Sequence, residues 1–304
     1  MLYRPLGRTD LLVSEIGFGA ASWWGMAAYS EAEAVRMVHV AVERGVTLFD
    51  TAPGYSRGEA EPRLGRALQG RAGDGLVVST KAGTRFERGR MVRDMSLAGI
   101  NLGVERSLSR LGVGVISLLQ LHGPDLEELT DDFIGGLLAL KSRGLVRALG
   151  VNSFDPAVVE RAIALAGIDV VMIDYNVLRS DCEPLIARAA EAGKGILAGM
   201  PLAMGHTGLQ TLKLLAPRDV WYALRALKNH RREMAQGLRM TFLGETSGMT
   251  GAQAALAYVL ENPHVASAVV GSTRLKHLQE NLDVPGLRLP PEVLLRIRRV
   301  QAGE

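Results

Sequence analysis

Several features are scarce or missing in this chain of 304 residues, and each absence narrows what it does. The single cysteine, Cys182, excludes an intrachain disulfide and a cysteine-based metal cluster. The six histidines are scattered without the spacing of metal ligands. No apolar run is long enough to span a bilayer, and the N-terminus lacks the apolar core of a secretory signal. We therefore expect a cytoplasmic protein that binds neither a metal ion nor a membrane.

The sequence also lacks a cluster of residues that carry the same sign of charge. The net charge is +3, and the calculated pI of 9.1 reflects a small excess of arginine rather than a basic block. We therefore expect no nucleic-acid partner. Hydrophobic residues make up 47% of the chain and charged residues 22%, which is typical of a soluble protein with a sizeable core. The length suits one large α/β barrel or two ordinary domains.

Short apolar runs alternate with helical patterns along the chain, which indicates βαβ units and a parallel sheet. Eight such repeats predict an α/β fold, a single (β/α)8 TIM barrel over residues 1–304 without a domain boundary. A β-hairpin from residues 3–6 and 11–14 precedes the barrel, and an extra helix over residues 291–301 follows it. The expected strands cover residues 16–19, 47–50, 76–81, 115–122, 146–151, 170–175, 195–198 and 265–270.

Helix boundaries and one long connection complete this outline. Ser30 and Glu33 predict a capping box at the start of a helix. Asp155 followed by Pro156 predicts another helix start. The segment 200–248 is the one long irregular connection, and its apolar pattern at 219–235 suggests partial helix. Long loops in compact domains tend to be functional, so this segment is a candidate part of the site.

Polar side chains follow three successive strands of the predicted barrel. Asp50 and Tyr55 come after the second strand, Lys81 ends the third and His122 ends the fourth. Because the ends of parallel strands meet at one rim of a barrel, we expect these four side chains to lie together. A lone histidine or lysine after a strand is usually structural or solvated, but four complementary groups in order favour a catalytic site.

The chemistry of the four groups suits the reduction of a carbonyl. A carbonyl that accepts a hydride also needs a proton on its oxygen, and a tyrosine hydroxyl can supply it. A free phenol has a pKa of about 10, so forming its phenolate near neutral pH is costly. A neighbouring lysine ammonium favours the phenolate, and an aspartate keeps that lysine charged and in place. A histidine can orient the carbonyl oxygen or share its proton.

This set of residues resembles the aldo-keto reductases, and comes closest to their bacterial sugar and general aldehyde reductases and dehydrogenases. The resemblance implies an NADP(H)-dependent oxidoreductase that interconverts an aldehyde or ketone, such as a sugar or hydroxy-carbonyl, and its alcohol. It makes Tyr55 the acid/base, Lys81 the residue that lowers the pKa of Tyr55, Asp50 the partner of the lysine and His122 the group that orients the carbonyl. The alternative is a regulatory or scaffold subunit that keeps the fold and binds the cofactor.

The stretch from Gly271 to Asn281 follows the eighth strand and begins a helix. Free N–H groups and the dipole at a helix N-terminus favour phosphate, and an arginine there can hold it bidentately. The resemblance makes this stretch the adenosine end of the NADP(H) site; the alternative is an ordinary helix start with a surface arginine. The implied contacts are Ser272, Thr273 and Arg274 at the 2′-phosphate, Glu280 and Asn281 at the adenine, and Gly271 and His277 elsewhere along the cofactor.

The expected nicotinamide end departs from the family pattern. Asn152 and Ser153 stand where the family often has Ser-Asn, so the two polar types are reversed. Met172 replaces a glutamine, and Gly199 stands where many members have an aromatic residue that stacks on the nicotinamide. The resemblance places Met200 and Leu202 at the cofactor as well, with Met200 as a candidate to compensate.

The substrate side carries the weakest signals. Trp23 and Trp24 are adjacent in a loop and cannot both face the same core, so at least one is a candidate for the substrate pocket. Packing beneath the loop is the equally supported alternative, and Tyr29 could join them. Arg85, Arg88, Arg90 and Arg93 follow the third strand; a solvated loop explains them better than an anionic substrate. The oligomeric state is not predicted.

Overall fold

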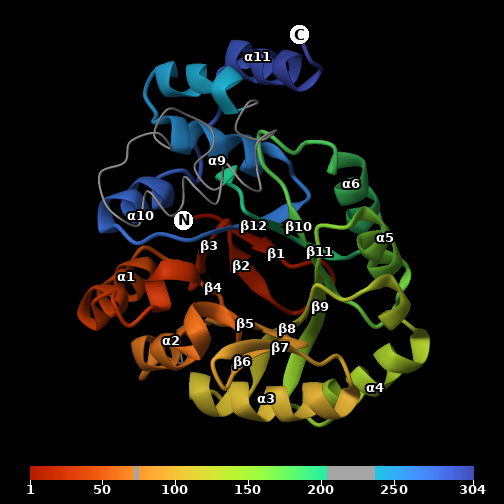
Figure 1. The fold of residues 1–304 in the computed structure, drawn as a ribbon. Helices are drawn as coiled ribbons and strands as arrows, with labels where there is room; N and C mark the ends of the chain where they lie inside the picture. Colours follow the sequence, from red (N-terminus) through yellow and green to blue (C-terminus); the bar gives the residue numbers. More distant parts are fainter. Residues whose placement is uncertain (72–74, 204–236) are drawn as a thin grey trace.

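The computed structural model describes residues 1–71, 75–203 and 237–304. Eight parallel strands close into a barrel in the order β10-β11-β12-β3-β4-β5-β8-β9, with helices around it (Figure 1). The strands are β3 (Ile16–Gly19), β4 (Leu48–Asp50), β5 (Val77–Ala82), β8 (Ile116–His122), β9 (Val146–Asn152), β10 (Val170–Asp174), β11 (Gly195–Gly199) and β12 (Val265–Val270). The eight-stranded parallel barrel predicted from the alternation is confirmed.

The helices follow the strands as expected, with capping signals at several starts. Ser30 accepts a hydrogen bond from the Glu33 amide, and Asp155 accepts one from the Ala157 amide. Within the described ranges, no helix is both long and apolar enough to cross a membrane. The α-helices of the described ranges are α1 (Glu31–Glu43), α2 (Ala60–Leu68), α3 (Leu97–Leu111), α4 (Asp131–Ser142), α5 (Pro156–Ala164), α6 (Glu183–Glu191), α9 (Gly251–Glu261), α10 (Leu275–Leu282) and α11 (Pro291–Gln301).

Two helical predictions need comment. The sequence pattern over residues 126–142 predicts one helix, which the structure divides into a short 3-10 helix η3 (Leu126–Glu128) and α4. The break occurs because Thr130, in extended backbone, caps α4 by accepting from the Phe133 amide. The partial helix predicted at 219–235 lies outside the described residues. Further 3-10 helices are η1 (Ser22–Gly25), η2 (Tyr55–Gly58) and η6 (Thr241–Glu245).

The barrel interior is apolar at one end and polar at the other. Side chains of a strand alternate between its two faces, so every second residue points inward. On β5 the alternate residues are Val77, Ser79 and Lys81, and on β8 they run from Leu118 through Gln120 to His122. The apolar members belong to an interior cluster with Leu48, Ala148, Val170 and Leu197. The inward-facing polar side chains of these two strands therefore lie beyond the apolar ones, toward the C-terminal ends of the strands.

The apolar end of the barrel is closed by the N-terminal hairpin of β1 (Tyr3–Pro5) and β2 (Leu12–Ser14). Leu6 and Val13 are fully buried in the interior cluster beneath the barrel strands. The Arg4 guanidinium donates to the carbonyls of Leu260 at 2.9 Å and Val265 at 2.7 Å. The first residues of the chain are therefore tied to the end of α9 and the start of the last strand.

A second hairpin, which was not expected, forms from β6 (Thr84–Glu87) and β7 (Arg90–Arg93). Its turn consists of Arg88 and Gly89, and both have positive φ, as a two-residue hairpin turn requires. The segment is therefore a hairpin rather than an irregular loop, and Arg88, Arg90 and Arg93 are exposed on it as expected. Two of its arginines make ion pairs: Arg85 with Glu87 and Asp94, and Arg93 with Asp125 and Glu128.

Candidate active site

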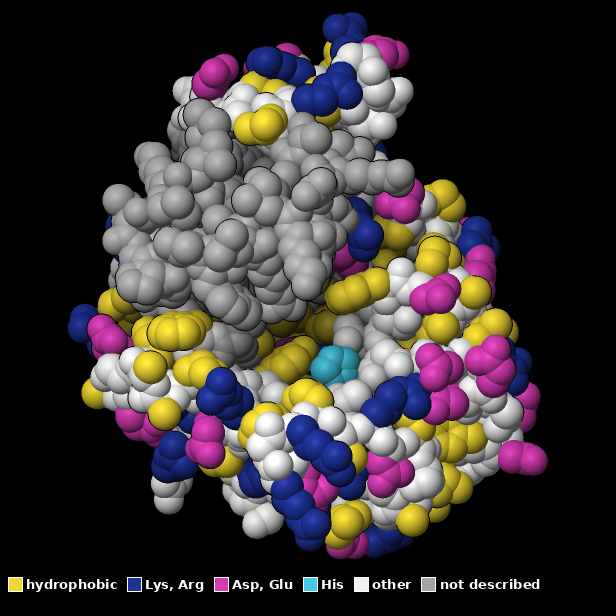
Figure 2. Space-filling view, in the orientation of Figure 1, with side chains coloured by type: hydrophobic (Ala, Val, Ile, Leu, Met, Phe, Trp, Pro, Cys, Tyr) yellow, Lys and Arg dark blue, Asp and Glu magenta, His cyan; other side chains and the backbone are white. Residues whose placement is uncertain are grey.

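The four side chains of the predicted tetrad come from adjacent elements at the C-terminal end of the barrel. Asp50 ends β4, Lys81 lies near the end of β5 and His122 ends β8, and these strands are neighbours in the sheet. Tyr55 is the first residue of η2, the short helix after β4. Figure 2 shows this face, where a histidine lies in a hollow beside hydrophobic side chains. The structure thus brings together all four residues singled out from the sequence.

Lys81 and Asp50 form a buried ion pair. The lysine Nζ lies 2.6 Å from Asp50 Oδ2 and donates to the Thr51 carbonyl at 2.9 Å. The two side chains are 1% and 6% exposed. Burial lowers the pKa of Lys81, but the charge of Asp50 and the neighbouring Tyr55 raise it, and the net shift is upward. Lys81 therefore carries its positive charge at neutral pH.

The second oxygen of Asp50 is held by two residues that the sequence analysis did not single out. Ser79 donates to Oδ1 at 2.8 Å, and Gln120 Nε2 donates to the same oxygen at 3.0 Å. Gln120 Nε2 also lies 2.9 Å from Ser79 Oγ. Ser79 and Gln120 are fully buried. Strand alternation would have found them, because each precedes a tetrad residue by two positions on the same inward face.

The Tyr55 ring lies between the lysine and the histidine. Lys81 Nζ is 4.9 Å from its centroid, and the His122 ring meets it edge-on at 5.7 Å. Directly after Tyr55, Ser56 and Arg57 adopt left-handed backbone with φ of 55° and 59°. Each non-glycine residue in such a region costs about 1–3 kcal/mol, and such strain clusters at functional sites. The turn that follows Tyr55 therefore keeps a backbone conformation that serine and arginine do not favour by themselves.

The hairpin of β6 and β7 packs on this strained turn. A Cβ on Gly54, just before Tyr55, would lie only 2.5 Å from Met91 Cε of β7. A Cβ on Gly58, at the end of η2, would lie 3.9 Å from Phe86 Cβ of β6. A side chain at position 54 would therefore displace the end of Met91, and the hairpin packs on the loop that carries Tyr55.

His122 is partly buried and makes one side-chain hydrogen bond within the described residues. Its Nδ1 lies 2.6 Å from Thr84 Oγ1, at the start of β6. Burial, followed by the charge of Lys81, lowers the pKa of His122 from 6.5 to about 4. The imidazole is therefore neutral near pH 7, and one of its two nitrogens is free of a proton.

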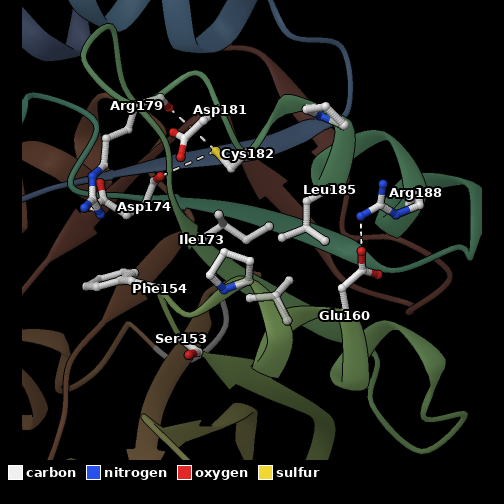
Figure 3. A pocket seen from close by; sticks show the side chains of 13 residues that line it. Ser153, Phe154, Glu160, Ile173, Asp174, Arg179, Asp181, Cys182, Leu185 and Arg188 are labelled. Carbon is white, nitrogen blue, oxygen red and sulfur yellow. Dashed lines mark hydrogen bonds and ion pairs between the residues drawn. The ribbon is translucent and has the colours of Figure 1, made fainter. Parts of the chain in front are cut away.

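The residues predicted for the nicotinamide end have different surroundings. Asn152 is paired with His122 in the β8–β9 register, and its buried carboxamide makes no hydrogen bond to the residues that the structure describes. Ser153 Oγ instead accepts from the Asp155 amide at 3.2 Å, at the start of α5. Figure 3 shows Ser153 at a cavity of about 340 Å³ that is also lined by Leu185 of α6. Asn152 is thus available to a ligand beside His122, whereas the Ser153 hydroxyl already accepts one local hydrogen bond and keeps its proton to donate.

The loop after β11 is strained where the aromatic residue is missing. Met200 and Ala203 both have φ of 47°, and the Met200 carbonyl accepts from Asn176 Nδ2 at 3.1 Å. Leu202 is half-buried and packs against the core. A Cβ on Gly199 would lie 3.6 Å from Cε1 of Phe154, whose side chain is 49% exposed. Phe154, from the loop after β9, thus brings an aromatic ring next to the position where Gly199 has no side chain.

The stretch after β12 leads into α10. The sequence pattern predicts a helix over residues 273–281, but α10 begins at Leu275. The reason is that Ser272 Oγ bonds the backbone of Arg274 on both sides, at 3.2 Å to its amide and 2.9 Å to its carbonyl. Arg274 is the exposed N-cap and makes no ion pair within the described part of the chain. The other expected contacts are Gly271 and His277, which are exposed, Glu280, which is half-buried, and Asn281, which is buried.

The two tryptophans face different environments. Trp24 is 1% exposed and packs edge-on against Phe18 in the core, so its assignment to a substrate pocket is wrong and packing beneath the loop holds instead. Trp23 lines a cavity of about 540 Å³ together with Tyr29, Thr273 and Arg274. It therefore lies toward the expected adenosine end. Among the described residues, no group of histidine, cysteine, aspartate or glutamate side chains could hold a metal ion.

Comparisons with known proteins agree with this geometry. The sequence model of the Aldo/keto reductase family matches residues 15–302. An uncharacterized oxidoreductase of Bacillus subtilis, YqkF, is 29% identical over 95% of this chain and 92% of its own length. D-threo-aldose 1-dehydrogenase of a Pseudomonas species is 28% identical over 92% of each chain. The structure of glycerol dehydrogenase AKR11B4 from Gluconobacter oxydans superposes with a TM-score of 0.82, at 26% identity, over 99% of this chain and 95% of that one.

Proposed function

Because the chain belongs to the aldo/keto reductase family, we propose that it interconverts an aldehyde or ketone and its alcohol with NADP(H) as cofactor. The bound nicotinamide supplies or takes up a hydride, and the protein manages the proton. The observation that carries this proposal is the buried Lys81–Asp50 pair beside Tyr55 and His122. An ion pair buried this completely requires a functional explanation, because burial of two charges contributes little stability by itself.

In the reducing direction, the Tyr55 hydroxyl donates its proton to the carbonyl oxygen. The charge of Lys81, 4.9 Å from the ring centroid, stabilises the phenolate that remains. Asp50 keeps Lys81 charged within the barrel, and Ser79 and Gln120 hold Asp50. Neutral His122 donates a hydrogen bond to the same carbonyl oxygen. In the oxidising direction, the phenolate accepts the proton of the alcohol.

The polar and aromatic side chains at the C-terminal end of the barrel suit the two ends of NADP(H), the nicotinamide and the adenosine 2′-phosphate. Asn152 offers a free carboxamide beside His122, where both a donor and an acceptor can meet the nicotinamide amide. The Phe154 ring offers the aromatic surface that Gly199 lacks. Arg274, an exposed cation at the start of α10, suits a 2′-phosphate, and Glu280 and Asn281 lie further along the same helix for the adenine.

The substrate class that fits best is a small polyhydroxylated carbonyl compound or the corresponding alcohol. Two relatives are named for an aldose and for glycerol, which are both polyols or sugars. Among the described residues, Arg85 and Arg93 of the β6–β7 hairpin form ion pairs with acidic residues, which leaves less positive charge to bind an anionic substrate. A hydroxylated, uncharged compound is therefore the better candidate.

Steady-state absorbance at 340 nm with NADPH or NADH and a panel of aldehydes, ketones and aldoses tests this function. We expect oxidation of NADPH with at least one carbonyl compound and formation of NADPH with the matching alcohol. Tight binding of NADPH without turnover on any compound would contradict the proposal and support a regulatory subunit.

A further inference from the structure

Thr84 contacts the tetrad although it lies outside it. It is the first residue of β6, and its Oγ1 is 2.6 Å from Nδ1 of His122. Nε2 of His122 has no partner among the described residues, so it is the ring nitrogen left to meet a ligand. The proton of the neutral ring can lie on either nitrogen. Its position decides whether Nε2 donates a hydrogen bond or accepts one.

The hydroxyl of Thr84 favours one of these two arrangements. When it donates to Nδ1, its only proton is used and the ring proton resides on Nε2. When Nδ1 carries the proton and donates to Thr84, the hydroxyl proton has no acceptor among the described residues and must turn to solvent, which reaches this half-buried side chain only in part. A bare Nε2 would also place its lone pair against the lone pairs of a carbonyl oxygen.

We propose that Thr84 is a positioning residue that holds neutral His122 with its proton on Nε2, aimed at the carbonyl oxygen. The inference rests on the proposed function for its role in catalysis, since only a carbonyl substrate needs a donor there. The tautomer itself is a property of the protein without substrate, and it can be measured separately.

Ion pairs link the hairpin that carries Thr84 to the segment after His122. In the hairpin register Thr84 lies opposite Arg93. Arg93 donates to Asp125 at 2.9 Å and to both oxygens of Glu128, at 2.8 Å and 2.5 Å. Both acidic residues lie in the segment directly after His122, which ends β8. The hairpin that carries Thr84 is thus linked to the segment that follows the histidine.

The tautomer can be measured by NMR on the full chain labelled with ¹⁵N-histidine. Long-range ¹H–¹⁵N spectra near pH 7.5 separate the two neutral tautomers by their ring nitrogen shifts, and His122→Asn identifies the signals of His122. We expect the Nε2–H pattern in the wild type, a shift toward the tautomer average in Thr84→Val, and the wild-type pattern in Thr84→Ser. Thr130→Val, which removes the capping hydroxyl of α4, should leave these signals unchanged.

Kinetics should follow the spectra. Thr84→Val should lower kcat for carbonyl reduction roughly 2- to 10-fold, the range of one neutral hydrogen bond, without weakening NADPH binding. Thr84→Ser should restore the rate. An Nδ1–H pattern in the wild type, or unchanged His122 signals in Thr84→Val, would overturn the inference. A Tyr55→Phe variant that keeps its activity would instead overturn the proposed function, and the tautomer result would be unaffected.

Discussion

Lys81 Nζ and Asp50 Oδ2 lie 2.6 Å apart in a part of the barrel that solvent hardly reaches. The lysine comes from β5 and the aspartate from β4, so the pair joins two neighbouring strands at the level of the candidate site. Each charge compensates the other where water cannot. Removing either charge would leave the other buried without a counter-ion, so the stability of the fold should depend on both residues being present.

The replacement Asp50→Asn should destabilise the fold, because it leaves the positive charge of Lys81 buried without a counter-ion. Breaking a buried pair in this way costs about 3–5 kcal/mol. Urea unfolding at pH 7 measures this loss. Asp131→Asn is the matched control, since it breaks the exposed pair of Asp131 with Arg161 and should cost about 0–1 kcal/mol. A similar small loss for both variants would contradict the buried pair.

The replacement Tyr55→Phe removes the proton donor and keeps most of the ring packing on His122 and Lys81. Turnover should fall by the roughly 10²–10⁴-fold that a general acid contributes. NADPH affinity, measured by fluorescence titration, should stay within about twofold because the hydroxyl is assigned to the substrate and not to the cofactor. Near wild-type turnover in the purified variant would show that another group supplies the proton.

The lowered pKa of His122 predicts a pH dependence of stability. The folded pKa of about 4 lies below the unfolded value of 6.5, so between these pH values the unfolded chain binds more protons. The contribution is complete above pH 6.5 and is lost as the pH falls toward 4. Its slope is at most about 1.4 kcal/mol per pH unit. Urea unfolding from pH 4 to 7.5 should give a flatter profile for His122→Asn than for the wild type; parallel profiles would show that the histidine titrates normally.

The replacement Arg274→Ala should discriminate between the two nicotinamide cofactors. One charge-assisted hydrogen bond contributes about 1.5–3 kcal/mol, so NADPH binding should weaken roughly 10- to 100-fold while NADH binding is spared. Dissociation constants for both cofactors provide the test. Lys276→Ala removes another exposed cation from the first turn of α10 and serves as the control. Equal weakening for both cofactors would contradict a 2′-phosphate site.

The replacement Phe154→Ala should weaken both cofactors equally, because the nicotinamide ring is common to them. An aromatic contact contributes about 0.5–1.5 kcal/mol beyond its area, which corresponds to a roughly 2- to 10-fold rise in Kd. Leu295→Ala, which truncates an exposed apolar side chain on α11, is the control. No change in Kd for either cofactor would mean that Phe154 does not replace the aromatic residue missing at Gly199.

The sequence predicted most of the barrel because strand and helix periods, caps and glycine stops agree along it. Strand boundaries differ from the prediction by about one residue; β5, for example, runs from Val77 to Ala82 rather than over 76–81. The tetrad was accessible because its members follow separate strands. That residues 1–304 fold as one domain stays a prediction.

Long-range contacts were not accessible in the same way. The hairpin of β6 and β7 has only a two-residue turn of Arg88 and Gly89 as its local signal, and ion pairs with Asp125 and Glu128 support it from 32 or more positions away. The nearness of Phe154 to Gly199 depends on loops after different strands. No local pattern reports such contacts, because the barrel alone determines which loops are neighbours.

The pairing of β12 with β3, the last and first strands of the barrel, has a consequence for folding during synthesis. β3 obtains β4 as a neighbour early in synthesis, but its other edge pairs with β12, where Ala268 lies opposite Ile16. At the usual pace of translation, about 5–20 residues per second, that edge waits roughly 10–50 seconds for its partner. An open strand edge is a template for pairing with the wrong chain. Until the last strand emerges from the ribosome, β3 has one edge without its partner, and that edge is open to pairing with another chain.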